Sequence, residues 1–463
     1  MKAMKVRLAV LVAFVGGLYM LTALRADDKA KTPTPPASEK RTDAIKPKPL
    51  GDEVKKGLEY LVKQQHSNGG WGQGGGWRTV ENGGRIEGAQ VQDPPDVGNT
   101  CIATLALIRA GNTAKDGAYA KNVAKAIEFI CGHVEKSDEK SLYVTNLKGT
   151  QLHSKIGPFV DTFLTSLVLS ELKGNMPDEK SEKVLMASLT KTIKKIELNQ
   201  KADGTFAGNN GWASVLSQGL AGKGLARAAQ NGVAVNPQSL ERIQEQVASN
   251  FDGKAGEFKS SVGAGGGIAS ARGGRTAGAG AGGVTATSGA AKPSPAGAPS
   301  DAGVPLYAAG QGLTNLADVS AAQKREGVQA RKTLDDKDAK KEDKEKAQET
   351  LKKIEETERF RTEATKSVVK QLDRPEFVRG FGSNGGEEFL SFMNIGEALL
   401  MKGGEDFKKW DKVMTEGIVR VQDKDGSWSG QHCITGKTFC TASALLVLMS
   451  DRAPLTTTAD SKK

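Results

Sequence analysis

The sequence predicts an all-α fold built from six helical hairpins. Three observations carry this prediction: helical periodicity extends from about residue 51 to 452, the helices come in pairs, and the two members of a pair differ in character. The first helix of a pair is apolar along one stripe, whereas the second is apolar on most of its faces. A helix that is apolar on most faces is surrounded by others, so we expect the second helices to form an inner layer.

The first pair shows the pattern most clearly. Its outer segment, 54–65, carries Val54, Leu58 and Leu61 at helical spacing, and its inner segment, 96–112, is apolar on several sides. The unit recurs five times, pairing 123–136 with 158–175, 189–212 with 213–232, 240–254 with 306–323, 364–386 with 387–404, and 407–430 with 437–450. Several inner segments end in glycine, the expected residue just past a helix C-terminus.

Two insertions interrupt the fourth and fifth pairs. Residues 261–305 are almost entirely Gly, Ala, Ser, Thr and Pro, which is typical of a flexible segment without a core. Residues 323–361 are dense in Glu and Lys at i,i+4 spacing, which predicts an exposed charged helix; a partner-docking arm is the alternative. Residues 453–463 are expected to be a disordered tail.

The N-terminus has the order of an export signal. Lys2, Lys5 and Arg7 precede 17 uncharged residues, 8–24, and polar sequence follows. We therefore expect residues 1–26 to be a signal peptide or a membrane anchor and residues 27–50 to be a disordered tether. The rest of the chain is then exported to the periplasm or cell envelope, either secreted after cleavage or attached to the membrane through residues 8–24.

Composition narrows the function classes. The net charge of +11 comes without the interleaved basic and aromatic pattern of a nucleic-acid module, so no nucleic-acid partner is expected. Aromatic residues make up only 5% of the chain. Four cysteines are too few for a disulfide framework, and their spacing leaves buried thiols and one or two bridges equally open.

Two turns carry a family resemblance. Gln64, Gln65, Gly69, Gly70 and Trp71 form one copy, Gln422, Gly426 and Trp428 form another, and weaker copies lie at 200–206 and 380–386. They resemble the QW repeat of the terpenoid cyclase and protein prenyltransferase superfamily, over residues 51–452 apart from the insertions. The resemblance implies an (α/α)6 toroid in which Gln64 or Gln65, Trp71, Gln422 and Trp428 clamp neighbouring repeats. All inner helices would then begin at one mouth of a central cavity.

The catalytic signatures of that superfamily are missing. The Asp-x-Asp-Asp acid of squalene-hopene-type cyclases is absent, and Asp93 and Asp96 are the nearest acidic cluster. Where protein prenyltransferases hold zinc with Asp-x-Cys and His, this sequence has Glu387, Phe389 and Lys437. The pair His432-Cys433 is the remaining metal option. We therefore predict neither a metal site nor a cofactor.

Polar residues remain at the expected inner-helix starts. The candidates for acid–base catalysis are Asp93, Asp96, Asp161 and Glu388, and the candidates for ligand binding at the mouth are Asn99, Thr100, Thr162, Trp212 and Lys437. The favoured interpretation is that these residues cap helices and hydrate the rim, with Asp96 as an N-cap.

The sequence supports three functional hypotheses. The first is an exported, non-catalytic or divergent binding or scaffold protein that holds a small apolar ligand or a protein partner at the mouth. The second is an enzyme acting on an apolar isoprenoid-like substrate, with a rearranged acid such as Asp93, Asp96 or Asp161. The third is a glycan-active enzyme with paired carboxylates.

Overall fold

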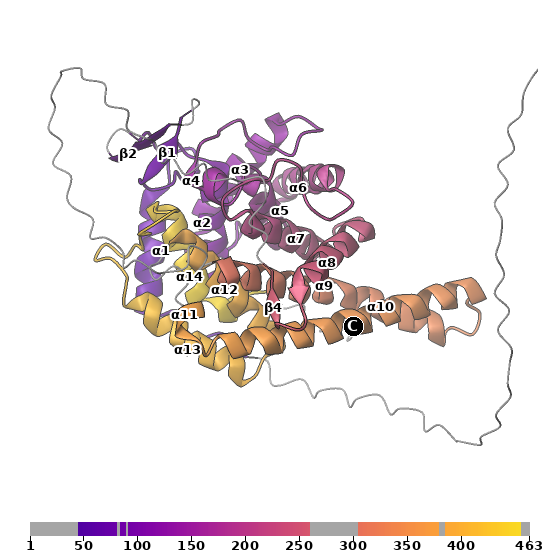
Figure 1. The fold of residues 1–463 in the computed structure, drawn as a ribbon. Coiled ribbons are helices and arrows are strands. Elements are labelled where there is room, and N and C mark those ends of the chain that lie inside the picture. The colour runs from indigo at the N-terminus through magenta and orange to yellow at the C-terminus, as the bar shows by residue number, and fades with distance from the viewer. Residues whose placement is uncertain (1–44, 81–83, 89–90, 260–303, 379–384, 455–463) are drawn as a thin grey trace, which may run out of the picture. The chain divides into compact units, whose positions relative to one another are not determined.

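The computed structural model describes residues 45–80, 84–88, 91–259, 304–378 and 385–454. Helices dominate these residues, and the few strands are short (Figure 1). The predicted all-α class is therefore confirmed. The predicted export segment, the tether up to residue 44, the degenerate turn at 380–384, the C-terminal tail from residue 455 and most of the 261–305 insertion lie outside the described residues. The last part of the predicted tether, residues 45–50, contacts the helices: Lys48 N donates a hydrogen bond to Asp451 at 2.7 Å, and Ile45 and Leu50 pack against the core.

Six helices form an inner layer. Nearly every residue of these helices is buried, polar positions included, except in α9 beyond residue 322. This burial matches the apolar character of their sequences on most faces. They are α2 (Val97–Arg109), α5 (Val160–Leu172), α7 (Ser214–Gln230), α9 (Val304–Asp335), α12 (Gly386–Lys402) and α14 (Lys437–Leu448). In that order each helix contacts the next, and α14 contacts α2, so the contacts form a closed circuit.

Six amphipathic helices pack against this inner layer. In α1, for example, Val54, Leu58 and Leu61 are buried, whereas the acidic and basic residues between them are mostly exposed. These helices are α1 (Asp52–Gln64), α3 (Ala120–Lys136), α6 (Glu179–Asn199), α8 (Pro237–Asn250), α10 (Lys341–Gln371) and α13 (Glu405–Val419). Each of them contacts at least one inner helix, so burial of one apolar stripe holds it in place.

The remaining elements are short. They are the helices α4 (Gln151–Lys155) and α11 (Pro375–Val378), the 3₁₀ helix η2 (Ser450–Arg452), and the strands β1 (Trp77–Thr79), β2 (Arg85–Glu87), β3 (Phe251–Asp252) and β4 (Glu257–Phe258). Strands β1 and β2 are antiparallel with Trp77 opposite Glu87, and β3 and β4 are antiparallel with Phe251 opposite Phe258. These two hairpins were not expected from the sequence.

The charged insertion is helical. Helix α9 continues to Asp335, a short turn follows, and α10 starts at Lys341 and runs back along α9 (Figure 1). The two helices pack where Gly327 faces Ile354, and most of the charged residues of this hairpin are exposed. Because the single inner helix α9 includes both the predicted inner segment and the start of the insertion, no break separates the two.

The glutamine of each QW-like turn ties two helices together. The side-chain amide of Gln65 donates hydrogen bonds to the carbonyl oxygens of Gly69 (2.8 Å) and Asn122 (2.9 Å), the latter in the first turn of α3. Gln64 is exposed, so Gln65 rather than Gln64 makes the contact between repeats. Matching bonds join Gln422 to Gly426 and Glu53, and Gln200 to Ser239.

The tryptophans of the two complete turns are fully buried. The indole N–H of Trp71 donates to the carbonyl oxygen of Leu61 at 2.7 Å, and that of Trp428 donates to Ile418 at 2.8 Å. In both turns the acceptor lies ten residues upstream, in the preceding outer helix. The backbone N–H of each tryptophan also donates to a threonine of the following inner helix. Each turn therefore joins an outer helix to its inner partner.

One glycine in each turn allows the close approach of the next outer helix. Gly69 has a φ of +91°, and a Cβ at this position would lie 2.3 Å from the carbonyl oxygen of Lys125 in α3. Gly204 (φ +79°) and Gly426 (φ +86°) are blocked in the same way by Arg242 in α8 and Lys56 in α1. This threefold repetition of one contact is the structural counterpart of the sequence repeat.

The additional glycines at 74–76 also have a structural role. All three have positive φ, between +78° and +87°, and the carbonyl oxygens of Gln73 and Gly74 accept hydrogen bonds from Thr438 N (3.2 Å) and Lys437 N (3.1 Å). These N–H groups are the first of α14 and have no acceptor within the helix. The loop therefore caps α14, and only residues that tolerate positive φ can form it.

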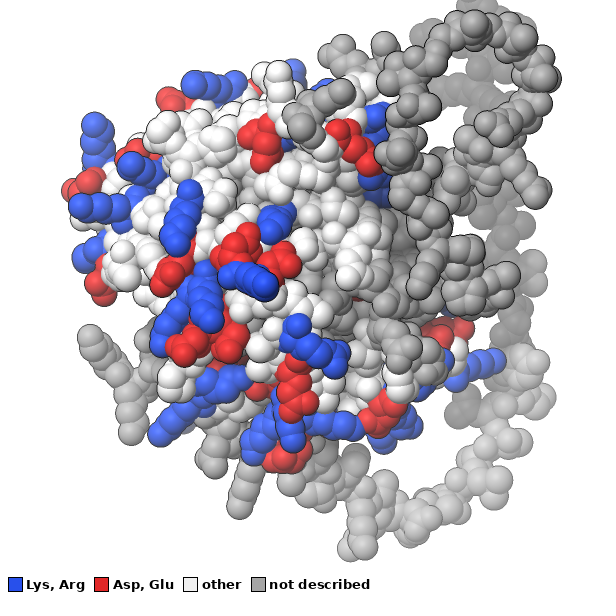
Figure 2. Space-filling view, turned by 90° about the vertical axis from the view of Figure 1, so that its left-hand side faces the viewer, with Lys and Arg blue, Asp and Glu red and all other residues white. Residues whose placement is uncertain are grey.

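The charged surface carries both signs. Figure 2 shows Lys and Arg interspersed with Asp and Glu on one face of the molecule, which is typical of a solvated surface. Of the helices in the described ranges, none is both long and apolar enough to span a bilayer.

Candidate ligand site at the inner-helix N-termini

The six inner helices begin at one common end. Asp96, which precedes α2, lies near Asp161 in the first turn of α5, and Ala213 N at the start of α7 donates to Lys155 of α4 at 2.6 Å. Tyr307 at the start of α9 bonds Glu388 at the start of α12, and the backbone N–H of Gly386 donates to Ile434 just before α14 (3.0 Å). We call this end the mouth.

Two adjacent glutamates lie at the start of α12. The side chains of Glu387 and Glu388 are 0% exposed. Glu388 accepts hydrogen bonds from Gly385 N (2.9 Å) and from the hydroxyl of Tyr307. Glu387 accepts one from Ile434 N (3.2 Å) through Oε2, whereas its Oε1 is buried and has no hydrogen-bond partner.

Burial dominates the electrostatics of this pair. It raises the pKa of Glu387 to about 8, with a further contribution from the charge of Glu388. Burial also raises the pKa of Glu388, against the opposing effects of His432 and of the Tyr307 hydrogen bond. Two adjacent buried carboxyl groups cannot both ionise without cost, so the pair favours protonation of one of them or a bound cation.

His432 completes a three-residue cluster. Its Nε2 lies 3.4 Å from Glu388 Oε2, and one ligand atom from each of Glu387, Glu388 and His432 lies within 4.8 Å of the other two. The next residue, Cys433, has a φ of +52° and is the single non-glycine residue with positive φ among the residues that the structure describes. Cys433, with this strained backbone, therefore separates two residues that contact the glutamate pair: His432 through its side chain and Ile434 through its backbone N–H.

A second polar cluster lies at the starts of α2 and α5. Asp161 Oδ2 lies 2.8 Å from His153 Nε2, and the side chain of Asp161 is buried. Burial lowers the pKa of His153, but the charge of Asp161 and its hydrogen bond outweigh this effect, so the net pKa is raised. Asp161 Oδ1 and His153 Nδ1 are both buried without a hydrogen-bond partner.

Asp96 belongs to this second cluster and caps α2. Its Oδ1 accepts a hydrogen bond from Asn99 N (2.8 Å), which is the N-cap arrangement, and Arg78 lies 3.8 Å from its Oδ2. Burial, followed by the charge of Asp161, raises the pKa of Asp96 to about 7. The hydrogen bonds from Asn99 lower the pKa of Asp96, but burial and the charge of Asp161 outweigh them.

Lys155 of α4 lies near the glutamate pair and two tryptophan rings. Its ammonium group is 5.6 Å from the ring centre of Trp77 and 5.8 Å from that of Trp212, and it lowers the pKa of Glu387. The Trp212 ring meets Tyr307 edge-on with centroids 6.2 Å apart. The mouth thus combines aromatic faces, a central cation and buried carboxyl groups.

The other predicted site residues lie at the mouth but have structural partners. The carboxylate of Asp93 accepts hydrogen bonds from Gln73 N (2.7 Å) and Gly74 N (2.8 Å), so it stabilises the glycine loop. The ammonium of Lys437 pairs with Asp425 at 3.0 Å, within the second QW-like turn. Asn99, Thr100 and Thr162 are fully buried and bond Asp96, the backbone at Asp96, and the backbone at Leu142, respectively.

A buried network of charges occupies the inner layer farther along the helices. We call it the charge ring; its members are Arg109, Glu171, Lys223, Arg227, Asp318 and Glu397, whose side chains are at most 2% exposed. Positive and negative members alternate around a closed circuit. Arg109 contacts Glu171 and Glu397, Lys223 lies 2.5 Å from Glu397, and Arg227 lies 3.8 Å from Glu171; Asp318 joins Lys223 to Arg227. Five of the six inner helices contribute to it.

The charge ring has three positive and three negative side chains, so its charges cancel. The cations Arg109, Lys223 and Arg227 offset burial of Glu397 and hold its pKa at about 2. Arg109 is the thirteenth residue of α2, so at about 1.5 Å per residue the network lies roughly three turns from the mouth. This network was not predicted from the sequence, although charged residues within otherwise apolar inner helices indicate it.

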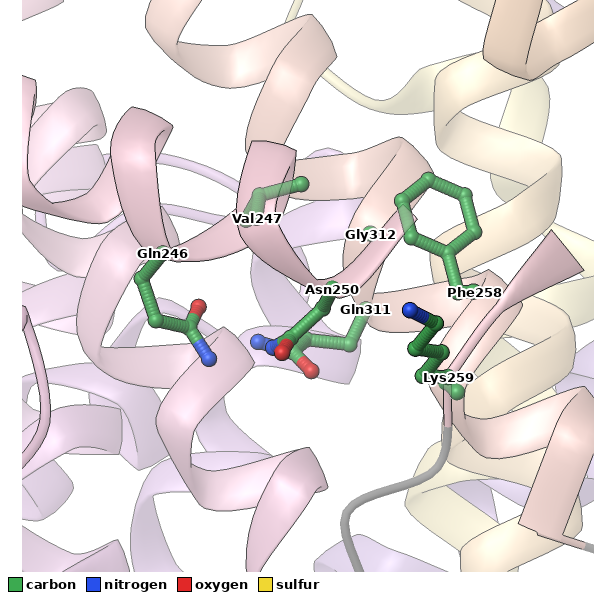
Figure 3. Close-up of a pocket in the computed structure, with 8 residues that line it drawn as sticks. Gln246, Val247, Asn250, Phe258, Lys259, Gln311 and Gly312 are labelled. Carbon is green, nitrogen blue, oxygen red and sulfur yellow. The ribbon is translucent and has the colours of Figure 1, made fainter. Parts of the chain in front are cut away.

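A separate small cavity lies between α8, β4 and α9. Figure 3 shows the amides of Gln246, Asn250 and Gln311 around it, with Phe258 and Lys259 on the other side. Its volume is about 10 Å³, which is the space needed by one water molecule. Gln246 Oε1 and Gln311 Nε2 are buried without a protein partner. The cavity therefore suits a structural water and is too small for an organic ligand.

Comparison with known proteins gives a distant structural likeness. Neither a protein-family model nor a curated protein sequence matches the chain. Among solved structures, the chain is similar to a variant of the type II terpene cyclase MstE from Scytonema in complex with geranylgeranyl dihydroxybenzoate, its substrate. The two share 11% sequence identity with a TM-score of 0.41, and the match covers 86% of this chain and 96% of the cyclase chain.

Proposed function

We propose that the helices of residues 51–452 form an (α/α)6 toroid of the terpenoid cyclase and prenyltransferase repeat class, and that the protein is a binding protein that holds its ligand at the mouth. The closed circuit of inner-helix contacts and the three matching QW-like turns support the toroid. The charge ring is the single observation that carries the functional proposal, because it determines what the interior of the toroid can accept.

The charge ring leaves no room for a deep apolar chamber at its level. An isoprenoid chain placed there would have to separate ion pairs that are at most 2% exposed, and separating buried charges from their partners costs several kcal/mol. The interior therefore favours polar ligands at the mouth over an apolar substrate along the axis. We therefore propose a polar ligand in place of the small apolar ligand expected from the sequence.

The acids at the mouth do not favour cyclisation either. Burial raises the pKa of Glu387 to about 8 and that of Asp96 to about 7, so both carboxyl groups can hold a proton at neutral pH but are weak proton donors. Asp93 is held by the backbone of the glycine loop. Asp161, the remaining candidate acid, is paired with His153 at 2.8 Å.

Export is the second part of the proposal. The positively charged start and the uncharged segment 8–24 support it. Fusing alkaline phosphatase after residue 50 should give active phosphatase in a bacterial host only when residues 1–26 are present. Activity independent of those residues would overturn this part.

The functional proposal is tested by product analysis. Purified protein incubated with squalene or geranylgeranyl diphosphate should give no cyclised product above the level of a boiled control, because the mouth lacks a strong acid and the interior is charged. A cyclised product that disappears in the Glu387→Gln or Asp96→Asn variant would overturn the binding-protein proposal and restore the isoprenoid-enzyme hypothesis.

A further inference from the structure

Three side chains at the mouth are arranged like the ligands of a metal ion. One ligand atom from each of Glu387, Glu388 and His432 lies within 4.8 Å of the other two, and His432 Nε2 is 3.4 Å from Glu388 Oε2. Bonds of about 2.1 Å in a tetrahedral site place neighbouring ligand atoms about 3.4 Å apart. We propose that these three residues bind a divalent metal ion, an inference that rests on the mouth being the ligand-binding end.

An unpartnered oxygen points to the same conclusion. Glu387 is 0% exposed, and its Oε1 has no hydrogen-bond partner, whereas Oε2 accepts the N–H of Ile434. A buried carboxylate oxygen without a partner is costly, and coordination to a cation would remove that cost. A dication would also offset the repulsion between the two adjacent carboxylates.

The surrounding groups orient the ligands. Ile434 N holds Glu387, while Gly385 N and the Tyr307 hydroxyl hold Glu388. Hydrogen bonds of this kind fix ligating carboxylates in metal sites and account for much of their affinity. The carboxylates are therefore held in place before an ion arrives.

The donor set selects the kind of ion. Two carboxylates and one imidazole, without a thiolate, suit Zn²⁺ or Mn²⁺ better than Cu⁺. The carboxylates are buried, but the side chain of His432 is 23% exposed, so an ion can reach the site from the His432 side. With three protein ligands, a further position stays available for water or a ligand.

The test is direct measurement of ion binding to the full chain. Protein stripped with a chelator and titrated with Zn²⁺ or Mn²⁺ should take up one equivalent, measured by calorimetry and by the change in the Mn²⁺ electron paramagnetic resonance signal. The isosteric Glu387→Gln and the partly exposed His432→Ala should each weaken binding at least about 100-fold, because each removes one of three ligands. Circular dichroism would verify that both variants fold.

Matched controls are available on the surface. Glu405→Gln in α13 and His66→Ala change an exposed acid and an exposed histidine, and both should bind the ion like the wild type. No saturable uptake by the wild type, or uptake unchanged in both site variants, would overturn the metal site. The product assay with isoprenoid substrates does not depend on the metal ion. Its outcome therefore tests the proposed function separately from the metal site.

Discussion

Replacing Glu397 by alanine is expected to lower the free energy of unfolding by about 3–5 kcal/mol, because removing one partner leaves buried charges without compensation. Glu397 lies 2.5 Å from Lys223 and 3.1 Å from Arg109, and all three side chains are at most 2% exposed. Equilibrium denaturation in urea, followed by circular dichroism, would measure the loss. The effect is large because neither cation can reach water without disrupting the inner layer.

The control for this variant is Glu405→Ala. Glu405 pairs with Lys408 at 2.7 Å, but its side chain is 86% exposed, so the change should cost less than about 1 kcal/mol. If Glu397→Ala were as mild as this control, the charge ring would not be the closed network described above. The charge ring would then no longer exclude an apolar chamber at its level.

Replacing Trp71 by alanine is expected to cost about 3 kcal/mol, within the usual range for a fully buried aromatic side chain. The change removes the packing of the ring and the hydrogen bond from its indole N–H to Leu61. Trp71→Phe keeps most of the packing but deletes that hydrogen bond. The lost bond should add about 1 kcal/mol to the small cost of the lost packing. The same denaturation assay separates the two contributions.

A suitable control for the tryptophan variants is Leu198→Ala. Leu198 is 61% exposed on α6, so its replacement should change stability by no more than about 0.5 kcal/mol. An unchanged unfolding transition for Trp71→Ala would contradict the clamp between repeats. A loss equal to that of Trp428→Ala would instead agree with the matching contacts of the two turns.

Local patterns in the sequence predicted much of the fold. Apolar periodicity identified the paired helices, and glycine spacing identified the turns, because both depend on residues close together in the chain. Asp96 as an N-cap followed from its place just before an apolar segment. These features need no knowledge of distant contacts.

The charge ring could not be assembled from the sequence. Its members are spread from Arg109 to Glu397, and their pairing depends on the depth and rotation of five helices. The same applies to His432, which comes to lie 3.4 Å from Glu388 through the path of the chain before α14. Sequence spacing suggested His432 and Cys433 as a pair, whereas the structure brings His432 to the glutamates.

Two smaller differences have local causes. Gln64 and Gln65 are adjacent in the sequence, and only the rotation of the end of α1 determines which one faces α3. Lys437 and Asp93 lie at the mouth as expected, but each is held by a neighbour in a turn. The place of these residues at helix starts therefore predicted that they lie at the mouth, but not whether their side chains are free to bind a ligand.

Thermal unfolding in the presence of two kinds of ligand tests the central claim most directly. A ligand at about 100 times its Kd stabilises a protein by about 2.7 kcal/mol, which is a measurable rise in Tm. A polar mouth above a charged interior predicts that Zn²⁺ or Mn²⁺ raises the Tm and that geranylgeraniol leaves it unchanged. A saturable rise with geranylgeraniol and none with either ion would contradict the account.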